Sequence, residues 1–200
     1  MSTTTESIST TRSATKTPTV HLERMDAGTI AVLTLDDPKR ANAMSPQMGD
    51  AFTQHVRSLI HDTALRAVII RGAGKDFSIG GHRDMLISLG DGKRSEKELH
   101  DFMLAFYHRW LPMLDLPVPV IVVLQGDCIG VAPVFACAAD IAIADETLRL
   151  QVTFASLGFY PGDGVAGAAE TPRRPIQRIA PVCHQRGPYR ARGRAIGLSR

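Results

Sequence analysis

Long apolar segments and a cysteine framework are both missing from this 200-residue sequence. The longest apolar run, 118–124, is much shorter than the roughly 20 residues that a membrane-spanning helix needs, so we expect no membrane partner. The cysteines are only three, Cys128, Cys137 and Cys183, and they have neither Cys-x-x-Cys nor Cys/His ligand spacing. We therefore expect reduced thiols, no metal site and a cytoplasmic location.

The N-terminal residues 1–18 lack the apolar segment of a secretory signal. They are rich in Ser and Thr and contain too little apolar surface to form a packed structure. Their single Arg and single Glu give little support for an organelle transit peptide. We expect a disordered leader over 1–18.

Acidic residues are absent from 171–200, which hold eight Arg. The rest of the chain then has 15 basic and 20 acidic residues, so the net charge of +3 comes from this tail. Clustered Arg can neutralise phosphates, but the four Pro and three Gly of the segment and its lack of apolar periodicity favour a chain that does not pack. We expect 169–200 to be a basic, disordered tail, produced by a frame change or truncation near residue 168, and we do not expect a nucleic-acid partner.

The remaining residues show alternating strand and helix patterns. Two β-branched runs, 20–25 and 30–35, flank an Asp-Ala-Gly turn and predict a hairpin. Ser45 followed by Pro46 predicts a helix N-terminus, and the apolar spacing continues to about Ile60.

Further along the chain, continuous apolar runs at 67–70 and 118–124 indicate strands that are covered on both faces. A helical apolar stripe spans 99–111, a short helix opens near Gly130, and a strand follows at 141–144. This order predicts one α/β domain over 19–168.

Two glycine-containing loops, 77–82 and 125–131, follow buried strands in this scheme. Glycine permits positive φ and close backbone approach. Two such loops at one end of a sheet could direct two N–H groups at a single oxygen, which is the arrangement of an oxyanion hole. The pattern by itself favours two tight turns, because neither loop matches a phosphate-binding motif.

The loops and their neighbours resemble a known family. The runs 37–46, 77–81, 125–140 and 158–162 are similar, in this order, to the enoyl-CoA hydratase/isomerase (crotonase) superfamily. The resemblance covers about 20–168 and implies a crotonase-like ββα spiral core whose C-terminal part is truncated or divergent. It also implies an acyl-CoA or acyl carrier protein (ACP) thioester as partner, no cofactor and a homotrimer.

The resemblance also assigns roles to individual residues. The backbone N–H groups of Gly81 and Val131 would form the oxyanion hole, although the family usually has glycine where Val131 stands. The residues expected to bind substrate are Ser78, Gly80, Arg83, Gly130, Val134 and Phe154. His82 is a candidate proton donor, and Arg83 could hold a carboxylate.

Two of these positions depart from the hydratases. Val134 and Phe154 stand where hydratases have general acid/base glutamates, and neither side chain can titrate. Together with Asp91-Gly92-Lys93 and the run 153–162, this resembles the decarboxylases of polyketide β-branching cassettes. Loss of CO2 leaves a dienolate that an oxyanion hole can stabilise without a glutamate base.

We therefore predict a lyase that decarboxylates a glutaconyl-type acyl-ACP in polyketide biosynthesis. One alternative is an enoyl-CoA hydratase/isomerase of fatty acyl-CoA metabolism. Others are an inactive truncated homologue and a basic-tailed binding protein.

Overall fold

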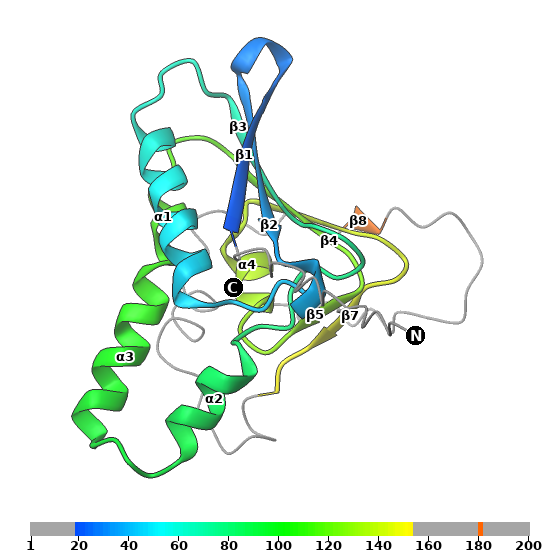
Figure 1. Cartoon of the computed structure of the whole chain (residues 1–200). Helices are drawn as coiled ribbons and strands as arrows, with labels where there is room; N and C mark the ends of the chain where they lie inside the picture. Colours follow the sequence, from blue (N-terminus) through cyan, green and yellow to red (C-terminus); the bar gives the residue numbers. More distant parts are fainter. Residues whose placement is uncertain (1–18, 154–179, 182–200) are drawn as a thin grey trace, which may run out of the picture.

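The structure is a computed structural model that describes residues 19–153 and 180–181 (Figure 1). Its main sheet contains, in spatial order, β1 (Thr19–Met25), β2 (Ile30–Asp36), β3 (Ala67–Gly72), β4 (Val120–Leu124), β6 (Ile141–Ala144) and β8 (Ala180–Pro181). A second sheet pairs β5 (Asp127–Ile129) with β7 (Arg149–Gln151). The helices are α1 (Pro46–Ile60), α2 (Arg83–Gly90), α3 (Glu96–His108) and α4 (Pro133–Ala138), with short 3-10 turns η1 (Asp26–Gly28), η2 (Pro38–Arg40) and η3 (Leu111–Asp115).

Strand directions confirm the predicted α/β class. The hairpin pair β1 and β2 is antiparallel, and every later neighbour in the main sheet is parallel. Parallel neighbours require crossover connections, and the helices supply them: α1 joins β2 to β3, α2 and α3 join β3 to β4, and α4 joins β4 to β6. In Figure 1, α1 and α3 lie on the same side of the main sheet.

Local sequence signals set the ends of several elements. The hairpin turns at 26–28, where Asp26, Ala27 and Gly28 all have positive φ. Helix α1 begins at Pro46 as predicted, because the Ser45 hydroxyl accepts a hydrogen bond from the Met48 N–H at 3.2 Å.

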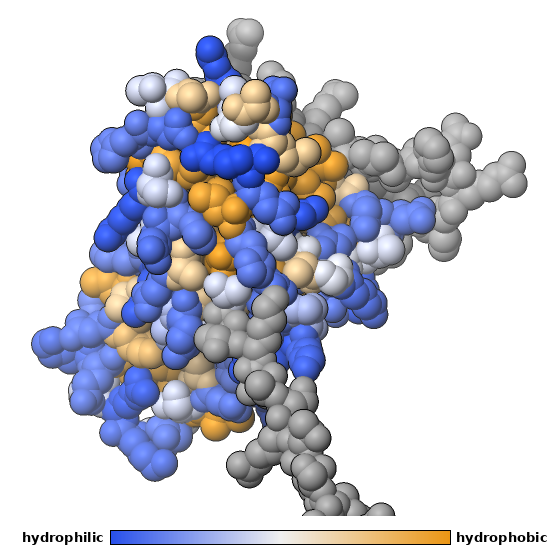
Figure 2. Space-filling view, turned by 45° about the horizontal axis from the view of Figure 1, so that its top comes forward, coloured by the Kyte–Doolittle hydropathy of each residue, from blue (hydrophilic) through white to orange (hydrophobic). Residues whose placement is uncertain are grey.

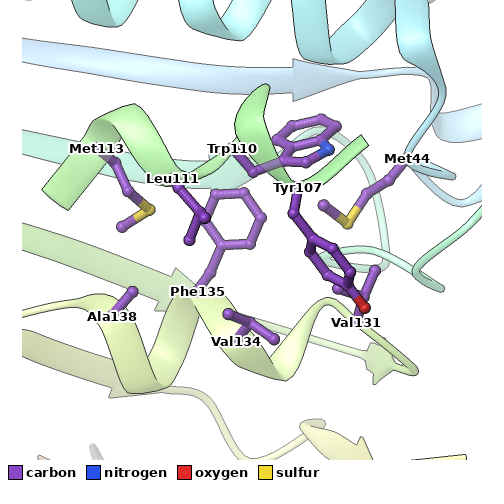
Figure 3. A pocket seen from close by; sticks show the side chains of 9 residues that line it. All are labelled: Met44, Tyr107, Trp110, Leu111, Met113, Val131, Val134, Phe135 and Ala138. Carbon is purple, nitrogen blue, oxygen red and sulfur yellow. The ribbon is translucent and has the colours of Figure 1, made fainter. Parts of the chain in front are cut away.

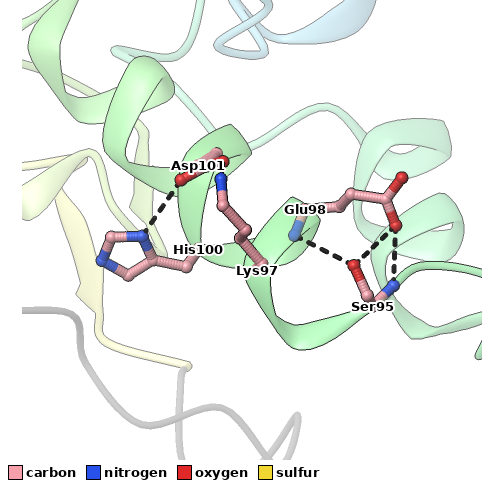
Figure 4. Close-up of polar contacts among 5 residues, drawn as sticks. All are labelled: Ser95, Lys97, Glu98, His100 and Asp101. Atoms are coloured by element: carbon pink, nitrogen blue, oxygen red, sulfur yellow. Dashed lines mark hydrogen bonds and ion pairs between the residues drawn. The ribbon is translucent and has the colours of Figure 1, made fainter.

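Helix α3 begins with a reciprocal cap (Figure 4). The Ser95 hydroxyl accepts from the Glu98 N–H at 3.3 Å, and the Glu98 carboxylate accepts from the Ser95 N–H at 2.8 Å. One turn further on, Lys97 and Asp101 form an ion pair at 2.6 Å. The hydrogen bonds from Ser95 lower the pKa of the Glu98 carboxyl, so the cap is present in its charged form at neutral pH.

An aromatic cluster fills the space between the helices and the sheet. Phe52 of α1, Trp110 and Phe135 of α4 lie with ring centroids 5.3–5.6 Å apart, and Phe77 packs against Phe135 at 5.8 Å. All four side chains are buried. Because Phe77 is the first residue of loop 77–82, the cluster packs directly against this loop.

Several expectations were incomplete or cannot be compared with the described residues. The strand expected at 118–124 begins at Val120, after Pro119, which has no N–H to donate to the ladder. The β5–β7 pair was not expected at all. The predicted leader 1–18, Phe154, the turn 158–162 and the predicted tail, except for the two residues of β8, lie outside the described part of the chain.

Polar and charged side chains cover most of the face seen in Figure 2, with apolar areas visible between them. Among the described residues, large apolar side chains that are clearly exposed include Met25, Ile87 and Val152. No helix in the described ranges has the length and apolar content to cross a membrane.

Candidate active site

The two glycine-containing loops lie side by side and are joined through their backbones. The Phe77 N–H donates to the Gln125 carbonyl at 2.7 Å, and the Ser78 N–H donates to the Asp127 carbonyl at 3.0 Å. In return, the Ile129 N–H donates to the Ser78 carbonyl at 3.0 Å. Ser78 forms an isolated parallel β-bridge with Cys128 of β5, and this pairing fixes the position of one loop relative to the other.

A third segment, 41–44, holds loop 77–82 from its other side. The Ile79 N–H donates to the Ala41 carbonyl at 3.1 Å, and the Met44 N–H donates to the Gly80 carbonyl at 2.7 Å. The His82 N–H donates to the Met44 carbonyl at 3.2 Å. Segment 41–44 and β5 therefore flank the loop.

Asn42 is the polar centre of this arrangement and is fully buried. Its side-chain oxygen accepts from the Asp37 N–H at 2.9 Å, and its amide nitrogen donates to the carbonyls of Ala73 and Asp76, each at 2.8 Å. Its backbone has φ of +51°, a conformation that Asn tolerates better than most residues. A single side chain thus ties 37–42 to the segment that leads into loop 77–82.

The backbone N–H groups of Gly81 and Val131, in these loops, have no acceptor among the described residues. The N–H groups beside them in sequence are all engaged, including Gly80 to the Ser78 hydroxyl at 3.1 Å and Gly130 to the Gln151 carbonyl at 2.8 Å. Buried N–H groups are rarely left without a partner, and Val131 is only 7% exposed. Neither donor is therefore engaged by the part of the chain that the structure describes.

Glycine is required for the close contact between the loops. Gly80 has φ of +78°, and a Cβ added to it would lie 2.5 Å from the Ile129 carbonyl oxygen and 3.0 Å from the Val131 nitrogen. Gly130 also has positive φ, at +67°. Any side chain at Gly80 would therefore push apart the loops that carry the two free N–H groups.

A cavity opens beside Val131 (Figure 3). Its volume is about 20 Å³, which is room for about one water molecule. It is lined by Met44, Tyr107, Trp110, Leu111, Met113, Val131, Val134, Phe135 and Ala138. In the described part of the chain its wall contains no charged side chain.

The other predicted site residues are placed as follows. Val134 of α4 lines the cavity, whereas His82 and Arg83 do not. His82 is the N-cap of α2, where its Nδ1 accepts from the Asp84 N–H at 3.3 Å, and Arg83 is exposed. The Ser78 hydroxyl is fully buried and donates to the Asn42 carbonyl at 2.8 Å, so it supports the loop. Phe154 lies outside the described residues.

Two residues of the site had not been predicted. Asn42 lies in a segment that carried the family resemblance, but its partners are more than 30 residues away, so no local signal identifies its role. Tyr107 had been read only as part of the apolar stripe 99–111. Its phenol is the one ionisable group in an apolar stripe that also contains the indole N–H of Trp110, and this is the signal that could have singled it out.

Potential metal ligands do not gather within the described ranges. No group of three or more His, Cys, Asp or Glu side chains there is placed to hold a metal ion. Burial raises the pKa of the Cys128 thiol, which lies in loop 125–131, to about 12, so it stays protonated at neutral pH.

The chain is similar to several known proteins. The family model for enoyl-CoA hydratase/isomerase matches residues 25–188. A Thermus thermophilus protein provisionally named an enoyl-CoA hydratase is 30% identical over 137 residues, which are 68% of this chain and 53% of that protein. The bacillaene synthase decarboxylase PksI of Bacillus subtilis is 28% identical over 130 residues, covering 65% of this chain and 49% of PksI.

Solved structures agree with the sequence matches. The crystal structure of a provisionally named enoyl-CoA hydratase/isomerase (crotonase) from Legionella pneumophila superposes with a TM-score of 0.68 at 25% identity, over 76% of this chain and 56% of that chain. The chain spans about half the length of the curated relatives it matches.

Proposed function

Since the chain belongs to the enoyl-CoA hydratase/isomerase family, we propose that it binds an acyl thioester with the carbonyl oxygen between the N–H groups of Gly81 and Val131. The observation that carries this proposal is that the N–H groups of Gly81 and Val131 have no acceptor among the described residues, and that the two loops that contain them are joined by backbone hydrogen bonds. Donors fixed in this way stabilise negative charge that develops on a thioester oxygen, because they need no rearrangement during the reaction.

The reaction that suits the site best is decarboxylation of a glutaconyl-type acyl thioester. The bond between the acyl chain and its carboxylate breaks, CO2 leaves, and the electron pair delocalises onto the thioester oxygen as a dienolate. The two N–H groups hold that oxygen, and the carbon then takes up a proton. His82 remains a candidate donor for this proton, because it follows Gly81 directly.

Support for decarboxylation over hydration comes from Val134. This side chain lines the cavity where hydratases have a glutamate, and it can neither activate water nor transfer a proton. Decarboxylation needs no general base, since breaking the carbon–carbon bond supplies the electron pair. The similarity to a polyketide decarboxylase is consistent with an ACP-bound substrate.

A second candidate is a hydratase or isomerase of fatty acyl-CoA substrates. The observation that favours it is the name of the Thermus relative, which is somewhat more similar to this chain than the decarboxylase is. This candidate requires an acid/base group outside the described residues.

The two candidates predict different products. The purified full chain is incubated with 3-methylglutaconyl thioester on ACP and on CoA, and with crotonyl-CoA, and the acyl masses are followed. Decarboxylation predicts loss of CO2 from the first substrate and no water addition to crotonyl-CoA. Hydration of crotonyl-CoA without loss of CO2 would establish the second candidate instead, and Gly80→Ala, which displaces the loops, is the matched negative control.

A further inference from the structure

Ser78 lies where the two glycine-containing loops are joined. Its N–H donates to the Asp127 carbonyl at 3.0 Å, and its carbonyl accepts from the Ile129 N–H at 3.0 Å. These two bonds form the isolated parallel bridge between Ser78 and Cys128. The backbone of Ser78 is therefore occupied in attaching its own loop to β5, and the side chain remains to act elsewhere.

The Ser78 hydroxyl uses both of its hydrogen-bonding functions inside the protein. It donates to the Asn42 carbonyl at 2.8 Å and accepts from the Gly80 N–H at 3.1 Å. A serine hydroxyl has a single hydrogen, and the Asn42 carbonyl takes it, so a lone pair is left for the Gly80 N–H. The side chain is fully buried, which places it to hold the loop and not to touch a substrate.

The N–H of Gly81 belongs to the peptide group between Gly80 and Gly81, whose carbonyl accepts from the Met44 N–H at 2.7 Å. In a planar trans peptide the N–H points opposite to the carbonyl, so the Gly81 N–H points away from Met44. Segment 41–44 and loop 125–131 lie on opposite sides of this peptide group. The Gly81 N–H is therefore turned toward the side on which the second loop lies.

This orientation needs restraint because Gly80 has no side chain. Its φ is +78°, and glycine leaves such a conformation more easily than other residues do. A rotation about φ or ψ of Gly80 would swing the Gly81 N–H to a new direction. The bond from the Gly80 N–H to the Ser78 hydroxyl opposes the first rotation, and the bond from Met44 to the Gly80 carbonyl opposes the second.

We propose that Ser78 is a positioning residue of the oxyanion hole, whose hydroxyl holds the Gly80 N–H and thereby directs the Gly81 N–H at the thioester oxygen. This inference rests on the proposed function, since it assumes that the oxygen lies between the N–H groups of Gly81 and Val131. Donors that are oriented before the substrate binds stabilise the developing charge without rearrangement. The hydroxyl itself touches no reacting atom, so its removal should weaken the hydrogen bond to the carbonyl and leave the other groups of the site in place.

The test observes the hydrogen bond at the carbonyl itself. Pentanoyl-CoA, a saturated thioester that neither decarboxylates nor adds water, is labelled with 13C at its carbonyl and bound to the full-length chain. Difference infrared spectroscopy gives the frequency of the bound carbonyl band, and calorimetry gives the dissociation constant.

Two variants of Ser78 and one control are compared with the wild type. Ser78→Ala removes only the hydroxyl, and Ser78→Cys replaces it with a thiol, which is a weaker donor and a weaker acceptor. Thr53→Val is the matched control, because the Thr53 hydroxyl also donates to a carbonyl, that of Arg109 at 2.6 Å, but lies on α1, outside the two loops. Circular dichroism and thermal melting confirm that each variant is folded.

We expect Ser78→Ala to move the bound band back toward the frequency of the free thioester and to weaken binding about five-fold, as the loss of one net hydrogen bond would. Ser78→Cys should lie between Ser78→Ala and the wild type in both measurements. Thr53→Val should lose stability and keep the wild-type band and affinity, since a purely structural loss does not reach the carbonyl.

The inference is overturned if Ser78→Ala, or Ser78→Cys where Ser78→Ala does not fold, keeps the wild-type band and affinity. It is also overturned if Thr53→Val moves the band as far as the Ser78 variants do. In both cases a shifted band in the wild type leaves the proposed function standing. If the folded wild type does not bind pentanoyl-CoA, or binds it with the carbonyl band of the free thioester, the proposed function fails and the inference fails with it.

Discussion

Replacing Asn42 with Ala should destabilise the protein and disturb the oxyanion loops together. Asn42 is fully buried, and its side chain partners the Asp37 N–H and the carbonyls of Ala73 and Asp76. Each net hydrogen bond contributes about 1 kcal/mol, and the orphaned groups stay buried, so the loss from hydrogen bonding is about 2 to 4 kcal/mol.

The backbone of residue 42 adds a second contribution. Its φ of +51° is tolerated by Asn but costs other non-glycine residues roughly 1 kcal/mol or more. Asn42→Gly removes the same hydrogen bonds and relieves this strain, so it should be about 1 kcal/mol less destabilising than Asn42→Ala. The pair of variants thus separates the hydrogen-bond contribution from the backbone contribution.

Urea unfolding followed by circular dichroism measures both differences. The Asn42 carbonyl also accepts from the Ser78 hydroxyl at 2.8 Å, so the affinity for pentanoyl-CoA should fall in both variants. An unfolding free energy of Asn42→Ala within about 0.5 kcal/mol of wild type would refute the reasoning, because substitutions without a structural role typically stay within that range.

Three other substitutions or conditions test the site. Gly80→Ala should lose at least about 2 kcal/mol of stability and most acyl-thioester affinity, since its Cβ would lie 2.5 Å from the Ile129 carbonyl oxygen. Gly92→Ala is the control, because Gly92 shares the positive φ but has open space around it. If urea unfolding shows the same loss of unfolding free energy for both variants, the loss is not caused by a clash between the loops. Val131→Gly should lower the unfolding free energy by about 2 kcal/mol and raise the calorimetric affinity for pentanoyl-CoA, because it removes a side chain from the cavity wall; weaker binding in a folded variant would contradict this. The buried Cys128 thiol, with a pKa of about 12, should resist alkylation at pH 8 in the folded protein, as mass spectrometry of its peptide can check. The Cys128 thiol ionises near pH 9 in the unfolded chain but only near pH 12 in the folded protein, so the stability that it contributes should be lost as the pH rises from about 9 to 12. The measurement is the unfolding free energy as a function of pH, with Cys128→Ala as the reference. Identical pH dependence of the two proteins over this range would contradict the prediction.

The parts of the fold that the sequence predicts correctly depend on short-range signals. The hairpin follows from its Asp-Ala-Gly turn, and the start of α1 follows from Ser45 and Pro46. The parallel strands β3, β4 and β6 follow from continuous apolar runs. Each of these signals lies within a few residues of the element it defines, so one sequence is sufficient.

The parts that the sequence does not predict depend on contacts between distant segments. The strands β5 and β7 have three residues each, which is too short for a recognisable pattern, and their pairing joins segments about 20 residues apart. The role of Asn42 depends on carbonyl groups that only the folded chain brings to it. The position of Gly81 and Val131 was predicted from the family resemblance, whereas the absence of acceptors for their N–H groups needed the structure.

The most direct test of the proposed oxyanion hole is the infrared carbonyl band of a bound thioester. Pentanoyl-CoA labelled with 13C at its carbonyl is added to the full-length chain, and the band of the bound form is compared with that of the free ligand by difference spectroscopy. Hydrogen bonds from Gly81 and Val131 predict a shift of the bound carbonyl band to lower frequency. A ligand shown by calorimetry to be bound, but with its carbonyl band at the frequency of the free thioester, would contradict the account.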